Sequence, residues 1–471
     1  MPTSQSSASL RIQSPALLRQ LGFFSATALV ISNMVGTAIF GTTGLMAGDL
    51  GSAGLILGCW AAGAVCAIAG ALSYSELGMN FPSSGGEYVY LTHAFGPDWG
   101  FMTGWVSFFA GFSAPIAAAA LTFSDYLGHF FPSLKQSNTP LVIGSGTFSL
   151  HLGPGQAVAS LLIAAFTILN CFGVGRTAKV QNVLTSTKII VILGFIFAAF
   201  LFGSGNGQAS WSHFSEPAIR TSTHGLPMQF LISLIWVMFG YSGWNSATYV
   251  AEEIRRPERT LPLALVVGSS IVAVLYLSLN LVYIYSTPLE TMKGQIAVGD
   301  LAASRLFGPG VASAFTAMLA VCIVSTVNAM VTVGPRVYYA MAKNKAFIAA
   351  ASRVNPRSHT PVVAIISQGI CAMLMTMTPF RDLLFYIGIS LTFFSVLAVA
   401  SLFVFRARRP GWQRLRAVQF AYPLIPAVYI VVGLAIMIFG LIGTPVASLA
   451  AFATVGAGAL VYHFKIRPQR P

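Results

Sequence analysis

Long apolar stretches, separated by short polar or basic segments, repeat along almost the whole chain. A helix rises about 1.5 Å per residue, so roughly 20 apolar residues are needed to cross the hydrocarbon core of a bilayer. Little of the chain remains outside stretches of about this length, which leaves no room for a soluble domain. The pattern predicts an all-α membrane protein with twelve transmembrane helices, at about residues 22–47, 53–79, 98–127, 156–174, 178–203, 227–252, 262–286, 311–342, 361–378, 383–406, 420–442 and 445–464.

The composition agrees with lipid as the main solvent. Of 471 residues, 55% are hydrophobic and 8% are charged, whereas soluble domains carry roughly a quarter charged residues. The net charge of +14 suggests nucleic acid at first, but the positions of Lys and Arg argue against it. With the N-terminus in the cytoplasm, 19 of them fall on the inside and 5 on the outside, as the positive-inside rule expects. We expect an integral protein of the cytoplasmic membrane, with both termini cytoplasmic, lipid as a partner and no nucleic acid.

Residue patterns typical of enzymes, metal sites and cofactor sites are missing from the sequence. The five cysteines all lie in apolar stretches, so no disulfide framework is expected. The seven histidines are not paired at metal-ligand spacing, and no zinc-protease, nucleophile-elbow or P-loop motif occurs. We therefore expect no metal, no cofactor and no enzyme activity.

Small residues interrupt the first and sixth stretches near their middle, around Gly36 and around Gly243. Gly in a helix interior costs about 1 kcal/mol relative to Ala, and such clusters are tolerated where the backbone opens onto a cavity. Close helix packing also favours small residues, and for either cluster alone the two explanations are equally good. Because the clusters lie five stretches apart, an odd number, the two halves enter the membrane in opposite orientation, which is the layout of an inverted repeat.

This repeat divides the chain into four parts. We expect a cytoplasmic tail at 1–20, a first five-helix repeat at 21–203 and a second, inverted repeat at 204–407. Helices eleven and twelve, with a short cytoplasmic tail, occupy 408–471 and lie outside the repeat. In such folds the binding site lies at the midplane, where the broken helices meet.

Two broken helices suit a zwitterion without any charged side chain. A half-helix that starts near Ile39 directs free N–H groups at the cavity and seats a carboxylate, and one that ends near Phe239 directs free C=O groups and seats an ammonium. Asn328, a polar residue in the eighth stretch, either lines this pocket or forms an interhelical hydrogen bond. The candidate substrate-binding residues are Gly36, Thr37, Ala38, Ile39, Phe239, Gly240, Tyr241, Ser242, Gly243, Trp244, Asn245 and Asn328.

Four residues are candidates for coupling or gating: Lys188, Phe239, Glu252 and Arg336. A Lys in mid-membrane costs about 2.5–3.5 kcal/mol on insertion scales, so Lys188 is a functional candidate by default. Arg336 could form an inner ion-pair gate with Glu252 and Glu253, although these residues also suit anchors at the water interface.

The same segments carry a family resemblance. Gly36-Thr37-Ala38-Ile39-Phe40, the segment from Phe239 through Glu253 to Arg259, and Pro82-Ser83-Ser84-Gly85-Gly86-Glu87-Tyr88 resemble signatures of the amino acid–polyamine–organocation superfamily. The chain is most similar to L-type amino acid transporters and their bacterial relatives. One departure is Ala38, where the family has Gly, so a tighter pocket or an altered carboxylate geometry is expected there.

The resemblance implies a LeuT-like 5+5 inverted-repeat fold and alternating access. It also implies that Lys188 replaces a sodium ion beside the first break, and that Phe239 is an aromatic lid over the substrate. The outside loop after the third stretch lacks the Cys that animal relatives use to join a heavy subunit, so no covalent heavy-chain subunit is expected.

The expected function is secondary transport of amino acids, as a proton symporter or an exchanger. The apolar and aromatic character of the candidate residues favours neutral amino acids. A transporter of polyamines or other organic cations would want acidic pocket residues, and none occurs at mid-depth of the two broken stretches. A membrane amino acid sensor on the same fold remains an alternative.

Overall fold

The structure is a computed structural model, and it describes residues 17–36, 38–135, 138–144, 149–203, 208–295, 298–378, 380–443 and 445–467. Each of the twelve predicted apolar stretches contains at least one helix. Within the described ranges, ten helical segments are long and apolar enough to cross a membrane, and two further apolar helices are shorter. The prediction of a helical protein with multiple membrane spans is confirmed.

Elements of the first half of the chain are mostly long helices. In order they are α1 (Phe23–Met34), α2 (Ala38–Leu50), α3 (Ala53–Asn80), α4 (Glu87–Phe95), α5 (Pro97–Val106), the π-helical η1 (Ser107–Ser113), α6 (Ala114–Leu127), the 3₁₀ turn η2 (Pro132–Leu134), β1 (Leu141–Ile143), β2 (Leu150–Leu152), α7 (Pro154–Cys171), α8 (Val174–Phe202) and the 3₁₀ turn η6 (Trp211–Phe214).

The second half continues in the same way. Its elements are α9 (Leu226–Gly240), the 3₁₀ helix η7 (Ser246–Glu253), α10 (Pro257–Ser286), α11 (Leu289–Met292), α12 (Val298–Phe307), α13 (Pro309–Val333), α14 (Pro335–Lys343), η8 (Ala349–Ser352), α15 (Val362–Met375), α16 (Phe380–Arg408), α17 (Arg416–Phe420), α18 (Leu424–Gly443), α19 (Pro445–Val461) and the π-helical η9 (Tyr462–Ile466).

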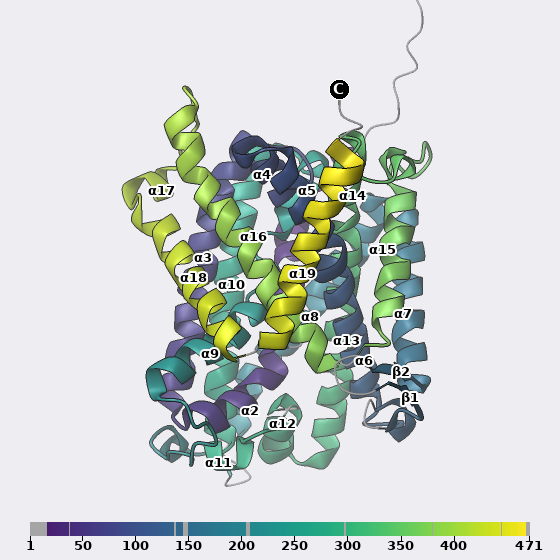
Figure 1. The fold of residues 1–471 in the computed structure, drawn as a ribbon. Helices are drawn as coiled ribbons and strands as arrows, with labels where there is room; N and C mark the ends of the chain where they lie inside the picture. Colours follow the sequence, from purple (N-terminus) through teal and green to yellow (C-terminus); the bar gives the residue numbers. More distant parts are fainter. Residues whose placement is uncertain are drawn as a thin grey trace, which may run out of the picture.

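The long helices run side by side along one axis, as Figure 1 shows. The short α4 lies at one end of this bundle, at the top of the figure, and we call this the α4 end. At the opposite end lie α11, α12 and the antiparallel hairpin of β1 and β2, and we call this the hairpin end.

Burial differs strongly among the spans. In the apolar part of the span that contains α1 and α2, 76% of the residues are buried, whereas the corresponding share in the span of α8 is 33%. Many exposed side chains of α7 and α8 are large and apolar, among them Leu161 (70% exposed) and Ile190 (69%). Such a surface suits lipid rather than water. The first span therefore lies at the centre of the bundle, where α1 packs against α8, α10 and α13.

Candidate functional site

The first span is interrupted at its middle. α1 ends at Met34 and α2 begins at Ala38, and between them Val35 has φ −74° and ψ 83°, which is not helical. Thr37 lies outside the described residues. A new helix start leaves backbone N–H groups without helical partners, and the start at Ala38 is one residue before the predicted one. The predicted interruption is therefore present, and its free N–H groups belong to the first turn of α2.

The sixth span is interrupted as well. α9 ends at Gly240, one residue beyond the predicted end, and the chain then turns before η7 starts at Ser246. Gly243 has φ +95°, a conformation that L side chains rarely adopt. The predicted break within the stretch 227–252 is therefore present, because the backbone leaves the helical region after Gly240 and resumes as a 3₁₀ helix.

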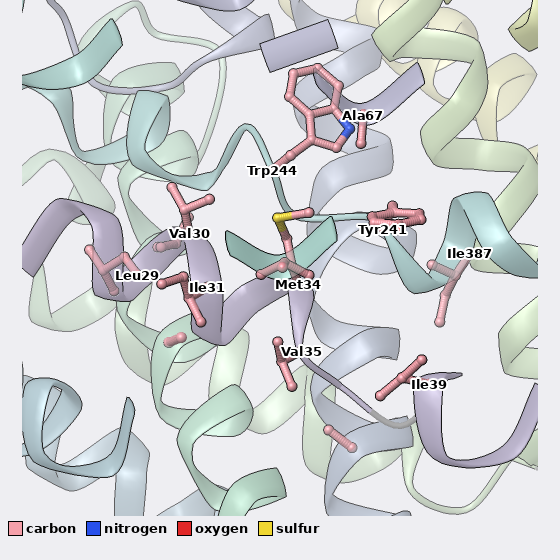
Figure 2. Close-up of a cluster of buried hydrophobic side chains, with 14 of the residues drawn as sticks. Leu29, Val30, Ile31, Met34, Val35, Ile39, Ala67, Tyr241, Trp244 and Ile387 are labelled. Carbon is pink, nitrogen blue, oxygen red and sulfur yellow. The ribbon is translucent and has the colours of Figure 1, made fainter. Parts of the chain in front are cut away.

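The two interruptions touch each other. A Cβ added to Gly243 would lie 2.9 Å from backbone and side-chain carbons of Asn33, so only hydrogen fits between the two segments. A Cβ added to Gly240 would lie 3.3 Å from the methyl of Ala38. The methyl of Ala38 at the start of α2 therefore lies close to the end of α9. Figure 2 shows the buried side chains around this contact, with Met34 and Val35 at the end of α1 near Tyr241 and Trp244.

One hydroxyl connects the two interruptions. The Tyr276 hydroxyl, on α10, lies 2.6 Å from the carbonyl oxygen of Met34 and 3.0 Å from that of Gly240, and can donate to either. Both carbonyls belong to helix ends that lack helical partners. The ring of Tyr276 is fixed by an edge-on contact with Trp60, at 5.2 Å between ring centroids. Tyr276 therefore holds both broken helices at a set separation.

Removal of this hydroxyl should weaken the transport that the sequence predicts, without unfolding the protein. In Tyr276→Phe the ring and its packing on Trp60 remain, but a hydrogen bond worth about 0.5–1.5 kcal/mol is lost. We expect a few-fold rise in the KM for uptake, measured in proteoliposomes, with a melting temperature within a few degrees of wild type. A wild-type KM in Tyr276→Phe would contradict this positioning role.

A cavity of about 100 Å³ lies between the two interruptions. Eight of the predicted binding residues line it: Gly36, Ala38, Phe239, Gly240, Ser242, Gly243, Trp244 and Asn245. Ile39, Tyr241 and Asn328 do not line it, and all three are fully buried in the protein interior. For Ile39 and Tyr241 the reason is the direction of the side chain, since Tyr241 packs edge-on against Trp60.

Asn328 belongs to a network of buried amides instead of the cavity. Its Nδ2 donates to Oε1 of Gln181 at 2.7 Å, and its Oδ1 accepts from Nδ2 of Asn170 at 3.1 Å. The Thr332 hydroxyl donates to Oδ1 of Asn170 at 2.8 Å. Of the two explanations for this residue, the interhelical hydrogen bond is the one observed, and it joins α13 to α7 and α8.

This position should matter for stability and not for substrate affinity. Asn328→Leu leaves Oε1 of Gln181 without its donor, which costs about 1–3 kcal/mol. It also removes one of the two acceptors of the Asn170 amide, which keeps the carbonyl oxygen of Phe166. We expect a lower melting temperature in detergent and a KM for uptake close to wild type. A KM raised tenfold at an unchanged melting temperature would show that Asn328 contacts substrate after all.

Other lining residues carried no marker in the sequence. They come from the η1 and α6 region, from α13, from α16 and from α18, and they are mostly small, apolar or hydroxyl-bearing: Gly111, Phe112, Pro115, Ala118, Ala119, Thr326, Met330, Gly388, Leu391, Thr392, Ser395 and Tyr429. Nothing in the local pattern separates them from ordinary residues of membrane helices. Their position in the wall follows only from the way the helices pack.

An acidic residue also lines the cavity. Glu87 reaches it from α4, which precedes the third span, and is only 6% exposed. Neither broken span has an acid at mid-depth, but a neighbouring helix supplies one to the cavity, and the pattern of the broken spans alone does not predict it. The segment from Pro82 to Tyr88 was a usable signal, because it was singled out as a signature without a role.

Lys188 lies beside the first interruption but not in the cavity. It is fully buried on α8, and its Nζ donates to the carbonyl oxygen of Val35 at 2.7 Å and to the Thr326 hydroxyl at 3.0 Å. The Thr326 hydroxyl in turn lies 2.9 Å from the same carbonyl. The lysine does not reach the aqueous surface, and it ties α8 and α13 to the interrupted backbone.

Of the two glutamates predicted for the gate, only Glu253 pairs with Arg336. Nε of Arg336 lies 2.6 Å from Oε1 of Glu253, and both side chains are at most 1% exposed. Glu252 is not the partner, since its Oε1 faces the backbone N–H of Ser84 at 3.4 Å. Neighbouring residues of η7 point in different directions, so only one of the two glutamates can face α14. Full burial also contradicts the alternative that Arg336 is an anchor in contact with water.

Comparison with known proteins agrees with this geometry. Residues 21–460 match the model of the family described as "Amino acid permease". The large neutral amino acids transporter small subunit 2 of Mus musculus is 26% identical over 451 residues, which cover 95% of this chain and 81% of the relative. The b(0,+)-type amino acid transporter 1 of Mus musculus is 27% identical over 449 residues, covering 94% and 86%.

A bacterial relative is similar to the same extent. The serine/threonine exchanger SteT of Bacillus subtilis is 29% identical over 415 residues, covering 87% of this chain and 88% of that protein. The family match spans nearly the whole bundle, including both interrupted helices and the cavity between them. This chain belongs to the amino acid permease family, and it is an amino acid transporter of the membrane rather than an enzyme.

Proposed function

We propose that this protein carries neutral amino acids across the cytoplasmic membrane by alternating access, as a proton symporter or an exchanger. The observation that carries the proposal is the pair of interrupted helices that meet at one cavity. The proposed fold has twelve spans, with a LeuT-like inverted repeat of 21–203 and 204–407. In this proposal the α4 end and both termini are cytoplasmic, and the two spans of 408–471 lie outside the repeat.

The backbone supplies both halves of the zwitterion site. The first turn of α2, from Ala38, offers N–H groups and the positive end of a helix dipole to a carboxylate. The end of α9, at Gly240, offers carbonyl oxygens to an ammonium. Gly36, Gly240 and Gly243 line the cavity, so the ligand reaches the backbone without passing a side chain. This arrangement recognises the part that all α-amino acids share.

The rest of the cavity favours an uncharged side chain. Its wall includes Phe239, Trp244, Phe112, Met330 and Leu391, and an apolar wall disfavours a charge that it cannot pair. Phe239 is the proposed lid.

Transport of an organic cation such as a polyamine is a second candidate, and Glu87 is the observation that favours it. The Glu87 carboxylate already accepts three hydrogen bonds inside the protein, which leaves little capacity for an ammonium group.

Lys188 is proposed to do the work of a bound cation beside the first interruption. Its ammonium holds the carbonyl of Val35, a group at the end of α1 that a metal cation could otherwise coordinate. This role supports a transporter that needs no sodium at that position. The absence of Cys from the loop between α6 and α7 supports a protein that works without a covalently attached heavy subunit.

Uptake into proteoliposomes tests the proposal. Purified protein is reconstituted and offered a panel of labelled neutral, cationic and anionic amino acids and one polyamine, with and without a pH gradient and internal substrate. We expect saturable uptake of neutral amino acids in sodium-free buffer. Uptake of the polyamine alone, or uptake that requires sodium, would overturn the proposal.

A further inference from the structure

Three carboxylates are buried toward the α4 end, and they differ in how their charge is balanced. Oε2 of Glu76 lies 2.7 Å from the guanidinium of Arg406, and Glu253 is paired with Arg336. Among the described residues, no Lys, Arg or His nitrogen lies within 4.0 Å of the third, Glu87. A buried carboxylate without a cation is costly, so this exception needs an explanation.

The described residues that contact the Glu87 carboxylate are all neutral donors. Its Oε1 accepts from the Tyr74 hydroxyl at 2.8 Å and from Nδ2 of Asn245 at 2.7 Å, and its Oε2 accepts from the Tyr249 hydroxyl. The titratable groups that face it are four phenols: Tyr74 on α3, Tyr90 on α4, Tyr249 on η7 and Tyr429 on α18. None of these phenols carries a positive charge. The Glu87 carboxylate can therefore bind a positive charge that enters from the cavity.

These bonds also close the α4 end against the sixth span. Two of the three donors, Asn245 and Tyr249, follow the interruption after α9. The backbone N–H of Gly85 donates to the carbonyl of Tyr249 at 3.3 Å, and the backbone N–H of Glu252 donates to the Ser84 hydroxyl at 3.2 Å. The Glu87 carboxylate is therefore the cavity-facing end of the contact between η7 and the loop before α4.

We propose that Glu87 is a proton-binding site of the transport cycle, which rests on the function proposed above. A carboxylate oxygen takes one proton from a hydronium ion in the cavity and becomes a neutral carboxyl group; one O–H bond of the hydronium breaks, and a water molecule is left. An ionised carboxylate only accepts hydrogen bonds, whereas a protonated one has an O–H that must donate. Protonation thus removes an acceptor from at least one of Tyr74, Asn245 and Tyr249, and it loosens the contact of η7 with the loop before α4.

A proton fits this position better than a larger cation. Three donors already occupy the two oxygens, and a metal ion or a substrate ammonium would have to displace several of them. Proton binding at Glu87 then changes the contacts of segment 241–253, and this segment also forms one wall of the cavity.

The test measures substrate-driven proton movement in proteoliposomes of the full chain, with a pH-sensitive dye inside. In wild type, we expect external substrate to acidify the interior in sodium-free buffer. Glu87→Gln mimics the neutral carboxyl, so we expect at least a tenfold fall in the number of protons moved per labelled amino acid transported. Glu258→Gln, which changes an exposed acid in the first turn of α10, serves as the matched control and should keep the wild-type ratio.

Each outcome decides one question. A proton signal that survives Glu87→Gln, for example because it belongs to Lys188, overturns the proposal. The proposal for Glu87 also fails if wild type exchanges amino acids without moving protons, or moves protons only when sodium is present. Either result leaves the proposed function intact. If wild type carries no amino acid at all, the proposed function fails instead.

A second variant covers the case in which Glu87→Gln does not fold. Tyr249→Phe removes one donor from the ionised carboxylate and should therefore shift the pH midpoint of uptake toward higher pH. An unshifted midpoint in Tyr249→Phe would count against Glu87.

Discussion

Alanine at Gly243 is expected to reduce uptake at least tenfold while the protein still inserts and folds. Gly243 has φ +95°, where an L side chain is strained by about 1–3 kcal/mol. Its new Cβ would also lie 2.9 Å from the backbone carbonyl of Asn33. The two interrupted helices would have to separate, and since each 1.4 kcal/mol is a factor of ten, a strain of this size is enough for the expected loss.

The control is a glycine without such a neighbour. Gly58 lies on α3, and a Cβ added there meets nothing within 4 Å. Gly58→Ala should therefore transport as wild type does. Initial uptake rates, normalised to the amount of reconstituted protein, give the comparison, and wild-type uptake by Gly243→Ala would mean that the close contact of the two helices is not needed for substrate binding.

Loss of the Lys188 ammonium is expected to have an effect of similar size or larger. Lys188 makes two buried hydrogen bonds, and bonds to charged groups are worth about 1.5–3 kcal/mol each. Lys188→Met keeps the length and apolar part of the side chain but frees the carbonyl of Val35 from its ammonium. We expect initial uptake to fall by roughly ten- to a hundredfold, because the end of α1 is no longer held to α8.

A lysine on the same helix provides the matched control. Lys179 is exposed and lies about two and a half turns from Lys188 on α8, so Lys179→Met should transport normally. Size-exclusion profiles in detergent separate a folding defect from a transport defect. If Lys188→Met matches Lys179→Met in uptake, the hydrogen bonds of Lys188 are not needed for transport.

The backbone of the site could be predicted from the sequence because its signal is local. Glycine and other small residues at the middle of an apolar stretch mark an interruption. The last residue of α9 and the first residue of α2 each fall within one residue of the predicted position. The direction of individual side chains could not be predicted. Ile39 and Tyr241 have neighbours in the cavity wall but point away from it, because one residue turns a side chain by about 100° around a helix.

Contacts between side chains of segments far apart in the chain also could not be predicted from one sequence. The preference of Arg336 for Glu253 over Glu252 depends on the twist of η7, and adjacent glutamates look equivalent along the chain. The bridge from Tyr276 to both interruptions joins a seventh span to a first and a sixth. Glu87 reaches the cavity from outside the two interrupted spans. In each case the packing of helices far apart in sequence decides the contact.

The amide network around Asn328 bears on how the molecule moves. Asn170, Gln181 and Asn328 come from α7, α8 and α13, and their hydrogen bonds are directional and buried. Sliding one of these helices by a single turn would leave several amides unsatisfied at once. We therefore expect the three helices to travel as one rigid body during the cycle, so that distances measured among them by spin labels stay constant while distances to α3 and α10 change.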